Sequence, residues 1–331
     1  MSLELATGAV LIASSRCVGE EVSGPSTVAA SPATILEAGA TVGYQATQFA
    51  RSSQTLQEAL QREHLTLFVG MSANLMGTGC REAMRFTLTR QLPTIVVLSA
   101  GAPEVDIERT LESVSYGSED ALAGFWNWLL PRLADEQKVK QKEAIARAQS
   151  EREDCLSDWM LTPSLFWHRV GQLLPAFTSP TVSRTSVLVT AAECGVPVFS
   201  PNFSDGPAGV AISKFNRTQD CSHRLRIDLV QDIGTLNKTA MKAKTTCMVI
   251  VGGGIVKHHV CNANLMRNGA DYAVFLNNAQ EYDGSDAGAR PDEAVSWGKI
   301  QVNGKSAKAY GEASVLFPLL VAKCLLTYPS R

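Results

Sequence analysis

The chain has 331 residues, of which 45% are hydrophobic and 19% are charged, and its formal net charge at pH 7 is −2. This composition supports a large buried core, and the small net charge argues against a nucleic-acid or anionic-membrane partner. No stretch approaches the roughly 20 apolar residues of a membrane span. The apolar run Gly8–Ala13 follows Glu4 without a preceding basic residue, unlike a signal peptide. We therefore expect a cytoplasmic protein with neither nucleic acid nor membrane as partner.

Eight cysteines are scattered along the chain, and none forms a Cys-x-x-Cys pair. Several stand in apolar runs such as Thr246-Cys247-Met248-Val249. This pattern predicts buried, reduced thiols and no metal site.

Residues 1–40 are rich in Ala, Ser, Gly and Val without a clear period, which predicts an N-terminal arm before a single domain over 41–331. Helical patterns follow at Thr55–Arg62 and at 78–91, and a charged, solvated helix is predicted over 133–154. Short apolar runs predict buried strands at 65–69, 94–98, 186–190, 196–199, 247–251 and 272–276. Because strands of this kind alternate with helices, the sequence predicts an α/β fold with a parallel sheet covered on both faces.

Three polar or glycine-rich turns follow predicted strands: Ser72-Ala73-Asn74, Ser99-Ala100-Gly101 and Gly252-Gly253-Gly254. All strands of a parallel sheet end at one edge, so these turns are expected to line one crevice, where open α/β sheets bind ligands. Glycines before a helix N-terminus also suit a phosphate group. The three glycines alone are equally compatible with a tight turn that holds no ligand.

The adjacent His258 and His259 follow the glycine turn, on different faces of a predicted helix, and each could instead be structural. The polar stretch 277–299 ends in Ser296-Trp297-Gly298-Lys299. A polar loop of this length is usually mobile or functional, and acids beside a tryptophan suit a cationic ligand. Lys299 could form a salt bridge with these acids or, if desolvated, act as a nucleophilic amine.

Several stretches resemble the deoxyhypusine synthase family: 257–259, 262–273, 288–300 and 317–322, with 43–47 and 197–201 upstream. The resemblance implies a Rossmann-like, NAD-binding domain. In this family NAD oxidises spermidine, and the aminobutyl group passes as an imine to an enzyme lysine. The group then moves to a lysine of the hypusine-bearing translation initiation factor and is reduced by the retained NADH. Family members are tetramers with sites built across a dimer interface.

Matching the motifs residue by residue implies that Lys299 is the imine lysine and His258 the proton-transfer base. The matches to the polyamine site are Asn262, Asp286, Glu293 and Trp297. The matches to the NAD site are Ser72, Asn74, Ala100, Asp205, Gly253, Asn277, Ala279, Asp283 and Gly284.

The chain also departs from the family pattern. Val210 stands where an aspartate helps to hold spermidine, and the other differences are Val105 for an acid, Ala287 for a serine, Asn278 for a threonine and Glu312 for an aspartate. The family's Arg-Gly-Lys and Asn-Arg-Ile-Gly-Asn segments have no counterpart in 112–160, where Trp126, Trp128 and the charged helix stand. An ammonium group that loses its carboxylate partner costs on the order of 1–3 kcal/mol.

Three interpretations remain. The departures favour an impaired or regulatory subunit that activates a catalytic deoxyhypusine synthase paralogue in a heterotetramer. Retention of Lys299, His258 and Trp297 favours a fully active homotetramer. An unrelated NAD-dependent deacylase-like enzyme has only the general fold in its support. We expect the first of these.

Overall fold

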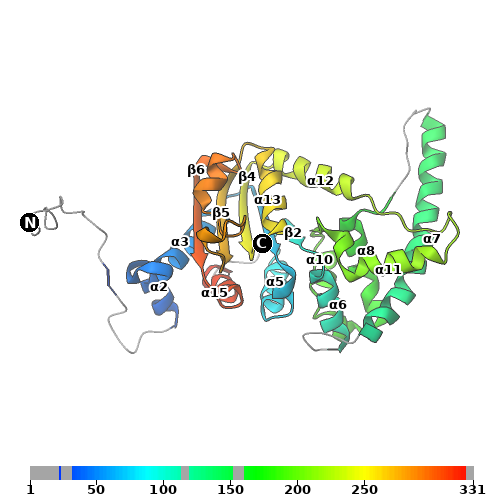
Figure 1. The fold of residues 1–331 in the computed structure, drawn as a ribbon, viewed down its shortest axis with the longest axis horizontal. Helices are drawn as coiled ribbons and strands as arrows, with labels where there is room; N and C mark the ends of the chain where they lie inside the picture. The colour runs from blue at the N-terminus through cyan, green and yellow to red at the C-terminus, as the bar shows by residue number, and fades with distance from the viewer. Residues whose placement is uncertain (1–21, 24–31, 113–118, 152–159, 326–331) are drawn as a thin grey trace, which may run out of the picture.

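The computed structural model describes residues 22–23, 32–112, 119–151 and 160–325, and these contain one parallel sheet of six strands. The strand order is β3-β2-β1-β4-β5-β6, so the direction of strand addition reverses between β1 and β4 (Figure 1). This is the order of doubly wound nucleotide-binding folds. The strands are β1 (Leu65–Met71), β2 (Ile95–Leu98), β3 (Val198–Phe199), β4 (Thr245–Val251), β5 (Ala270–Asn277) and β6 (Ile300–Tyr310). The predicted parallel α/β fold is confirmed.

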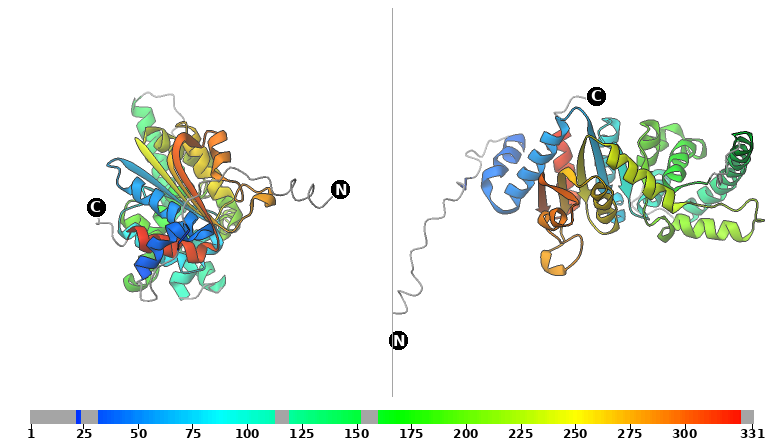
Figure 2. Two further views of the ribbon diagram at one scale, coloured as in Figure 1. Left: turned by 90° about the vertical axis from the view of Figure 1, so that its left-hand side faces the viewer. Right: turned by 90° about the horizontal axis from the view of Figure 1, so that it is seen from above.

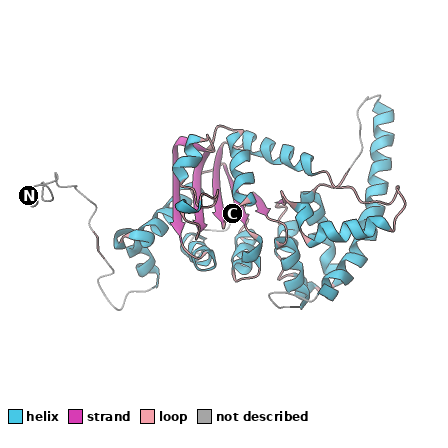
Figure 3. Cartoon of the chain, viewed as in Figure 1, coloured by secondary structure: helices cyan, strands magenta, loops and turns pink. Residues whose placement is uncertain are grey.

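Helices make up most of the remaining described chain (Figure 3). They are α2 (Pro32–Val42), α3 (Tyr44–Leu60), α4 (Ala73–Met76), α5 (Cys80–Thr89), α6 (Ala102–Glu112), α7 (Glu119–Glu151), α8 (Pro163–Phe177), α9 (Pro180–Ser183), α10 (Val187–Glu193), α11 (Pro207–Arg217), α12 (Leu229–Lys242), α13 (Ile255–Leu265), α14 (Pro291–Ser296) and α15 (Ala313–Leu325), with short 3-10 helices η1 (Phe203–Asp205) and η2 (Glu281–Asp283). None of the described helices is both long and apolar enough to cross a membrane.

The two faces of the sheet have separate apolar cores because successive strand side chains point to opposite sides. Leu67, Val69 and Val249 belong to the core formed with α3, α5 and α15, whereas Phe68 and Met248 belong to the core formed with α12, α13 and α14. Figure 2 shows these two layers of helices on either side of the twisted sheet. The sheet is therefore covered on both faces, as an apolar parallel sheet requires.

The predicted strand over 186–190 is wrong, because this segment begins helix α10. The Ser186 hydroxyl caps the helix by accepting from the Val189 N–H at 3.2 Å. The buried Asp106 carboxylate accepts from the N–H groups of Val187 at 2.9 Å and Leu188 at 3.0 Å. These acceptors satisfy the free N–H groups of the first turn and so offset the β preference of the branched side chains.

Five further elements differ from the expectations. Helix α3 begins at Tyr44, eleven residues before the predicted start, and strand β6 and helix α14 were not predicted. The predicted arm over 1–40 lies mostly outside the described residues, but its last part forms α2, which packs against α3. Strand β3 is shorter than the predicted 196–199.

Helix α7 combines a buried half and a solvated half. Its first part packs against α8 through aromatic contacts, with ring centroids of Trp126 and Phe166 6.1 Å apart. From Val139 to Arg147 its side chains are exposed or half-buried, and the helix extends away from the body (Figure 1). The predicted solvated helix is confirmed over this part, and residues 152–154 lie outside the described residues.

Candidate active site

The three predicted turns meet at the carboxyl edge of the sheet, as expected. The Ser72 N–H donates to the Val251 carbonyl at 3.1 Å, and the Gly253 N–H donates to the Ser72 hydroxyl at 3.3 Å. The Ala73 N–H donates to the Ser99 hydroxyl at 2.8 Å. Side chains and backbone of the turns after β1, β2 and β4 therefore form one hydrogen-bonded rim at the point where the strand order reverses.

Glycine is required in the turn after β4. Gly252 has a φ of +90°, and a Cβ atom at this position would lie 1.7 Å from the Ser72 Oγ atom. At Gly253 a Cβ atom would lie 2.3 Å from the Cβ of Ala287. The backbone of the turn is thus in direct contact with its neighbours, and the turn leads into helix α13, whose first N–H groups favour an anion.

The residues that match the family's NAD positions all follow the ends of strands. They lie after β1 (Ser72, Asn74), β2 (Ala100), β3 (Asp205) and β4 (Gly253), at the last residue of β5 (Asn277) and after β5 (Ala279, Asp283, Gly284). The Ala100 N–H donates to the Asn202 side chain at 2.9 Å, which joins the turn after β2 to η1 and Asp205. The Asn277 side chain donates to the Gly252 carbonyl at 3.3 Å. These residues are therefore brought to one edge of the sheet, the edge at which open α/β sheets bind ligands.

His258 and Asn262 lie one turn apart on α13. The Asn262 amide nitrogen lies 2.8 Å from the His258 Nε2 atom. An amide N–H can only donate, so Nε2 is the acceptor and the proton of a neutral His258 ring is on Nδ1. His259 is half-buried, and burial, with the charge of His258, lowers its pKa to about 4. Of the two histidines, only His258 is exposed.

Lys299 lies between α14 and β6, and both its N–H and its carbonyl form main-chain hydrogen bonds. Its N–H donates to the Ala294 carbonyl at 2.8 Å, and its carbonyl accepts from the Ala270 N–H at 3.0 Å. Burial raises the pKa of the Cys261 thiol in α13 to about 12, and the positive charge of Lys299 lowers this pKa by a smaller amount. Trp297 ends α14 and is 66% exposed, so its indole is available to a ligand or to another chain.

The remaining polyamine matches, Glu293 and Asp286, have exposed side chains. The Asp286 carbonyl accepts from the ammonium of Lys257, a buried residue that was not among the predicted site residues. A second missed group is Glu104, whose buried carboxylate accepts from the N–H groups of Gly101 at 3.0 Å and Ala208 at 3.2 Å. Burial raises the pKa of Glu104. An acid in the first turn of α6, directly after a strand, was the signal that could have identified it.

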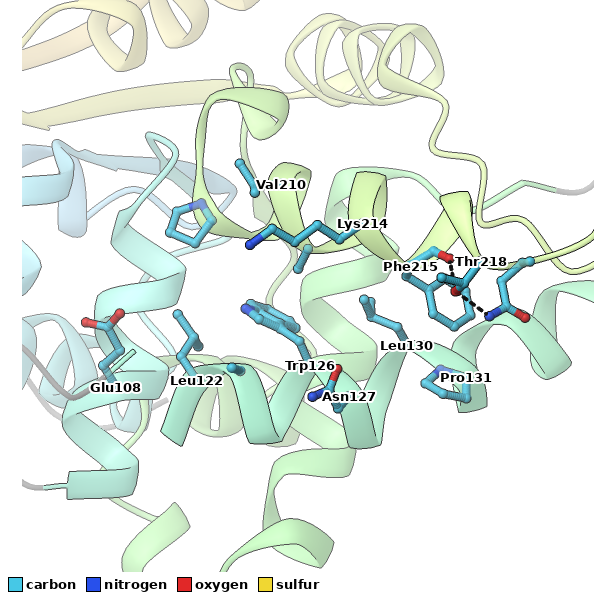
Figure 4. Close-up of a pocket in the computed structure, with 14 residues that line it drawn as sticks. Glu108, Leu122, Trp126, Asn127, Leu130, Pro131, Val210, Lys214, Phe215 and Thr218 are labelled. Atoms are coloured by element: carbon cyan, nitrogen blue, oxygen red, sulfur yellow. Dashed lines mark hydrogen bonds between the residues drawn. The ribbon is translucent and has the colours of Figure 1, made fainter. Parts of the chain in front are cut away.

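Val210 lies beside a groove of about 830 Å³ between α7 and α11, and Figure 4 shows the groove with Trp126, Leu130 and Phe215 among its lining side chains. Val210 is 54% exposed. The lining includes one lysine, Lys214, and one acid, Glu108. The position at which the resemblance expects a carboxylate is therefore apolar.

The sheet order and the turns that meet at its reversal point define a Rossmann-like α/β protein. The family model for deoxyhypusine synthase matches residues 34–324. The deoxyhypusine synthase of Trypanosoma brucei brucei is 32% identical over 451 aligned positions, which cover 98% of this chain and 96% of that protein. The deoxyhypusine synthase of Caenorhabditis elegans is 33% identical, with 97% of this chain and 94% of that protein covered.

A solved structure from Entamoeba histolytica, assigned to the same enzyme, shares the fold with a TM-score of 0.66 at 21% identity, over 92% of this chain and 96% of that one. The chain belongs to the deoxyhypusine synthase family, a family of transferases. In the described residues, no group of three or more His, Cys, Asp or Glu side chains could hold a metal ion.

Proposed function

We propose that this chain is an NAD-binding subunit of deoxyhypusine synthase that supports a catalytic paralogue and transfers the aminobutyl group poorly by itself. The substrate would be spermidine, and the acceptor would be a lysine of the hypusine-bearing translation initiation factor. The complex would be a tetramer of this chain with its paralogue, located in the cytoplasm. A fully active homotetramer is the alternative.

One contrast carries this proposal. The matches to the NAD positions lie at or after the ends of five adjacent strands, whereas the position expected to hold a polyamine ammonium carries the apolar side chain of Val210. Nucleotide binding is therefore expected to persist where polyamine binding is weakened. NAD, when bound, would supply the hydride acceptor for oxidation of the polyamine.

Each proposed catalytic residue has a role in terms of its own atoms. The His258 Nε2 atom can take a proton from a substrate ammonium or carbon once the Asn262 amide moves away from it, because the single lone pair of this atom accepts one donor at a time. The Lys299 amine, in its neutral form, can form the imine with the aminobutyl group. Trp297 offers an exposed indole face to a cationic chain, with Glu293 in the turn before it. Bound NAD would also stabilise the assembly by mass action.

The proposal is tested by comparing the purified chain with a co-purified mixture of this chain and a catalytic deoxyhypusine synthase chain from the same cell. Transfer of label from spermidine to the acceptor protein is measured with NAD present. The chain alone is expected to be slower by about tenfold or more, equivalent to ~1.4 kcal/mol of barrier. Equal rates for the chain alone and for the mixture would establish the homotetrameric alternative instead.

Restoring a carboxylate at position 210 should strengthen polyamine binding. Val210→Asp places an acid on an exposed position of α11, where it adds a charged partner for an ammonium at little cost in stability. We expect spermidine affinity of the chain to rise by roughly tenfold, as measured by calorimetry. Val210→Asn is the matched neutral control. If both variants bind spermidine equally, the missing carboxylate is not what weakens the site.

A further inference from the structure

Two lysine ammonium groups lie beneath the loop that joins β5 to α14. Lys257, in the first turn of α13, is 5% exposed and donates to the main-chain carbonyl of Asp286. Lys308, in β6, donates to the carbonyls of Ala279 at 3.1 Å, Ala287 at 3.2 Å and Gly288 at 2.6 Å. Four carbonyls of one loop therefore converge on two cations from different elements.

These ammonium groups have main-chain partners where an acid would be usual. Among the described residues, no carboxylate forms a salt bridge with either lysine, and the Lys257 Nζ atom lies 5.3 Å from the centroid of the Phe275 ring. Burial, and the nearby charge of Lys257, lower the pKa of Lys308. A desolvated cation must be compensated by dipoles or charges, so the loop carbonyls are held inward by strong, charge-assisted hydrogen bonds.

The two arms of the loop also contact each other, and one of them contacts the turn after β4. A Cβ atom at Gly288 would lie 2.1 Å from the Gln280 carbonyl, so the two arms of the loop touch directly. Ala287 packs on Gly253 of the turn after β4. Between these contacts the loop carries Asp283, which caps η2 through the Gln280 N–H at 2.8 Å. The two lysines thus hold the loop in place next to the turn after β4, through the loop carbonyls that accept from their ammonium groups.

From this geometry we infer that Lys257 and Lys308 are positioning residues that fix the 279–288 loop over the crevice and thereby set the affinity for the nucleotide. The inference rests on the proposed NAD function, because Ala279, Asp283 and Gly284 are the loop residues assigned to NAD. Neither lysine needs to touch the nucleotide. Each acts through the loop carbonyls that it binds.

The test uses the full chain with Lys308→Met, which keeps the length of the side chain and removes its three donors. The amides of Gln280, Asp283, Gly284 and Gly288 are hydrogen-bonded within the loop. Mass spectrometry should find their hydrogen exchange faster by about tenfold or more, and titration with NAD alone should give a dissociation constant raised by about tenfold. Lys257→Met should produce the same two changes.

Lys305→Met is the matched control, since Lys305 lies on the same strand and its ammonium pairs with Glu58 at the surface. It should change neither loop exchange nor NAD affinity. If Lys308→Met does not fold, Lys308→Arg retains a cation whose planar fork cannot converge on three carbonyls, and exchange in the loop should still rise. Unchanged exchange in the variants that fold would overturn the inference. Faster exchange in a chain whose wild type binds no NAD would refute only the proposed nucleotide function.

Discussion

Lys299→Ala is expected to reduce aminobutyl transfer by this chain alone to background, while a mixed complex with a catalytic paralogue keeps more than about half of its rate. Losing half of the rate corresponds to well under ~1.4 kcal/mol in barrier. The chain alone should lose transfer because the proposed mechanism contains no other amine that could form the imine with the aminobutyl group. The mixed complex should keep transfer because the catalytic chain would supply the essential lysine. Rates with labelled spermidine and the acceptor protein measure both.

The structure makes this substitution a clean probe of chemistry. The backbone of Lys299 is held by Ala294 and Ala270 through main-chain atoms that alanine retains. The same change in the catalytic chain of the mixture should abolish transfer, which provides the internal comparison. A fall to background when only this chain carries Lys299→Ala would sink the regulatory interpretation and make Lys299 the nucleophile of the complex.

Asp106→Asn is expected to lower the stability of the folded chain by about 3–5 kcal/mol, as for a buried ion pair that loses one partner. Asp106 is 0% exposed. Its carboxylate accepts from Arg81 at 2.7 Å, from Ser186 at 2.6 Å and from the first N–H groups of α10. The amide cannot accept with both terminal atoms, and it leaves the buried Arg81 guanidinium with only the half-exposed Glu82 as a charged partner, at 3.3 Å. Denaturant unfolding of the purified chain measures the loss.

Asp135→Asn is the matched control for that experiment, because Asp135 is exposed on α7. Its effect should stay within about 0.5 kcal/mol, as for ordinary surface substitutions. A loss below about 1 kcal/mol for Asp106→Asn would mean that the carboxylate does not hold α5, α6 and α10 together.

The sheet and its crevice could be predicted because their signals are local. The runs at 65–69 and 247–251 are apolar, short and followed by turn residues, and their strands lie side by side in the structure. Strand β6 escaped prediction because its residues are largely polar, and its pairing with β5 depends on a partner distant in sequence. The segment 186–190 was misassigned because its helix depends on Asp106, which is about 80 residues earlier in the chain.

The candidate site also combines residues that have a local sequence signal with residues whose role depends on distant parts of the chain. Lys299, His258 and Trp297 stand out by residue type within a recognisable motif, and Asn262 follows His258 at the spacing of one helical turn. Lys308 gave no such signal, since a lysine in a polar strand usually points to solvent. Only the three-dimensional path of the loop brings its carbonyls to that ammonium group. Roles that depend on the arrangement of main-chain acceptors cannot be deduced from side-chain identity.

The reversal of strand order between β1 and β4 also has a consequence for biosynthesis. Ser72 and Gly253, which meet at the crevice, are 181 residues apart in the chain. At a translation rate of about 5–20 residues per second, roughly 10 to 40 s separate their emergence from the ribosome. During that interval β4, one of the two strands that pair with β1, has not yet been made. The edge of β1 that β4 will cover is therefore open to non-native pairing. Chains released before β4 is made would lack the Ser72–Gly253 contact altogether, so the proposed nucleotide site is a late product of folding.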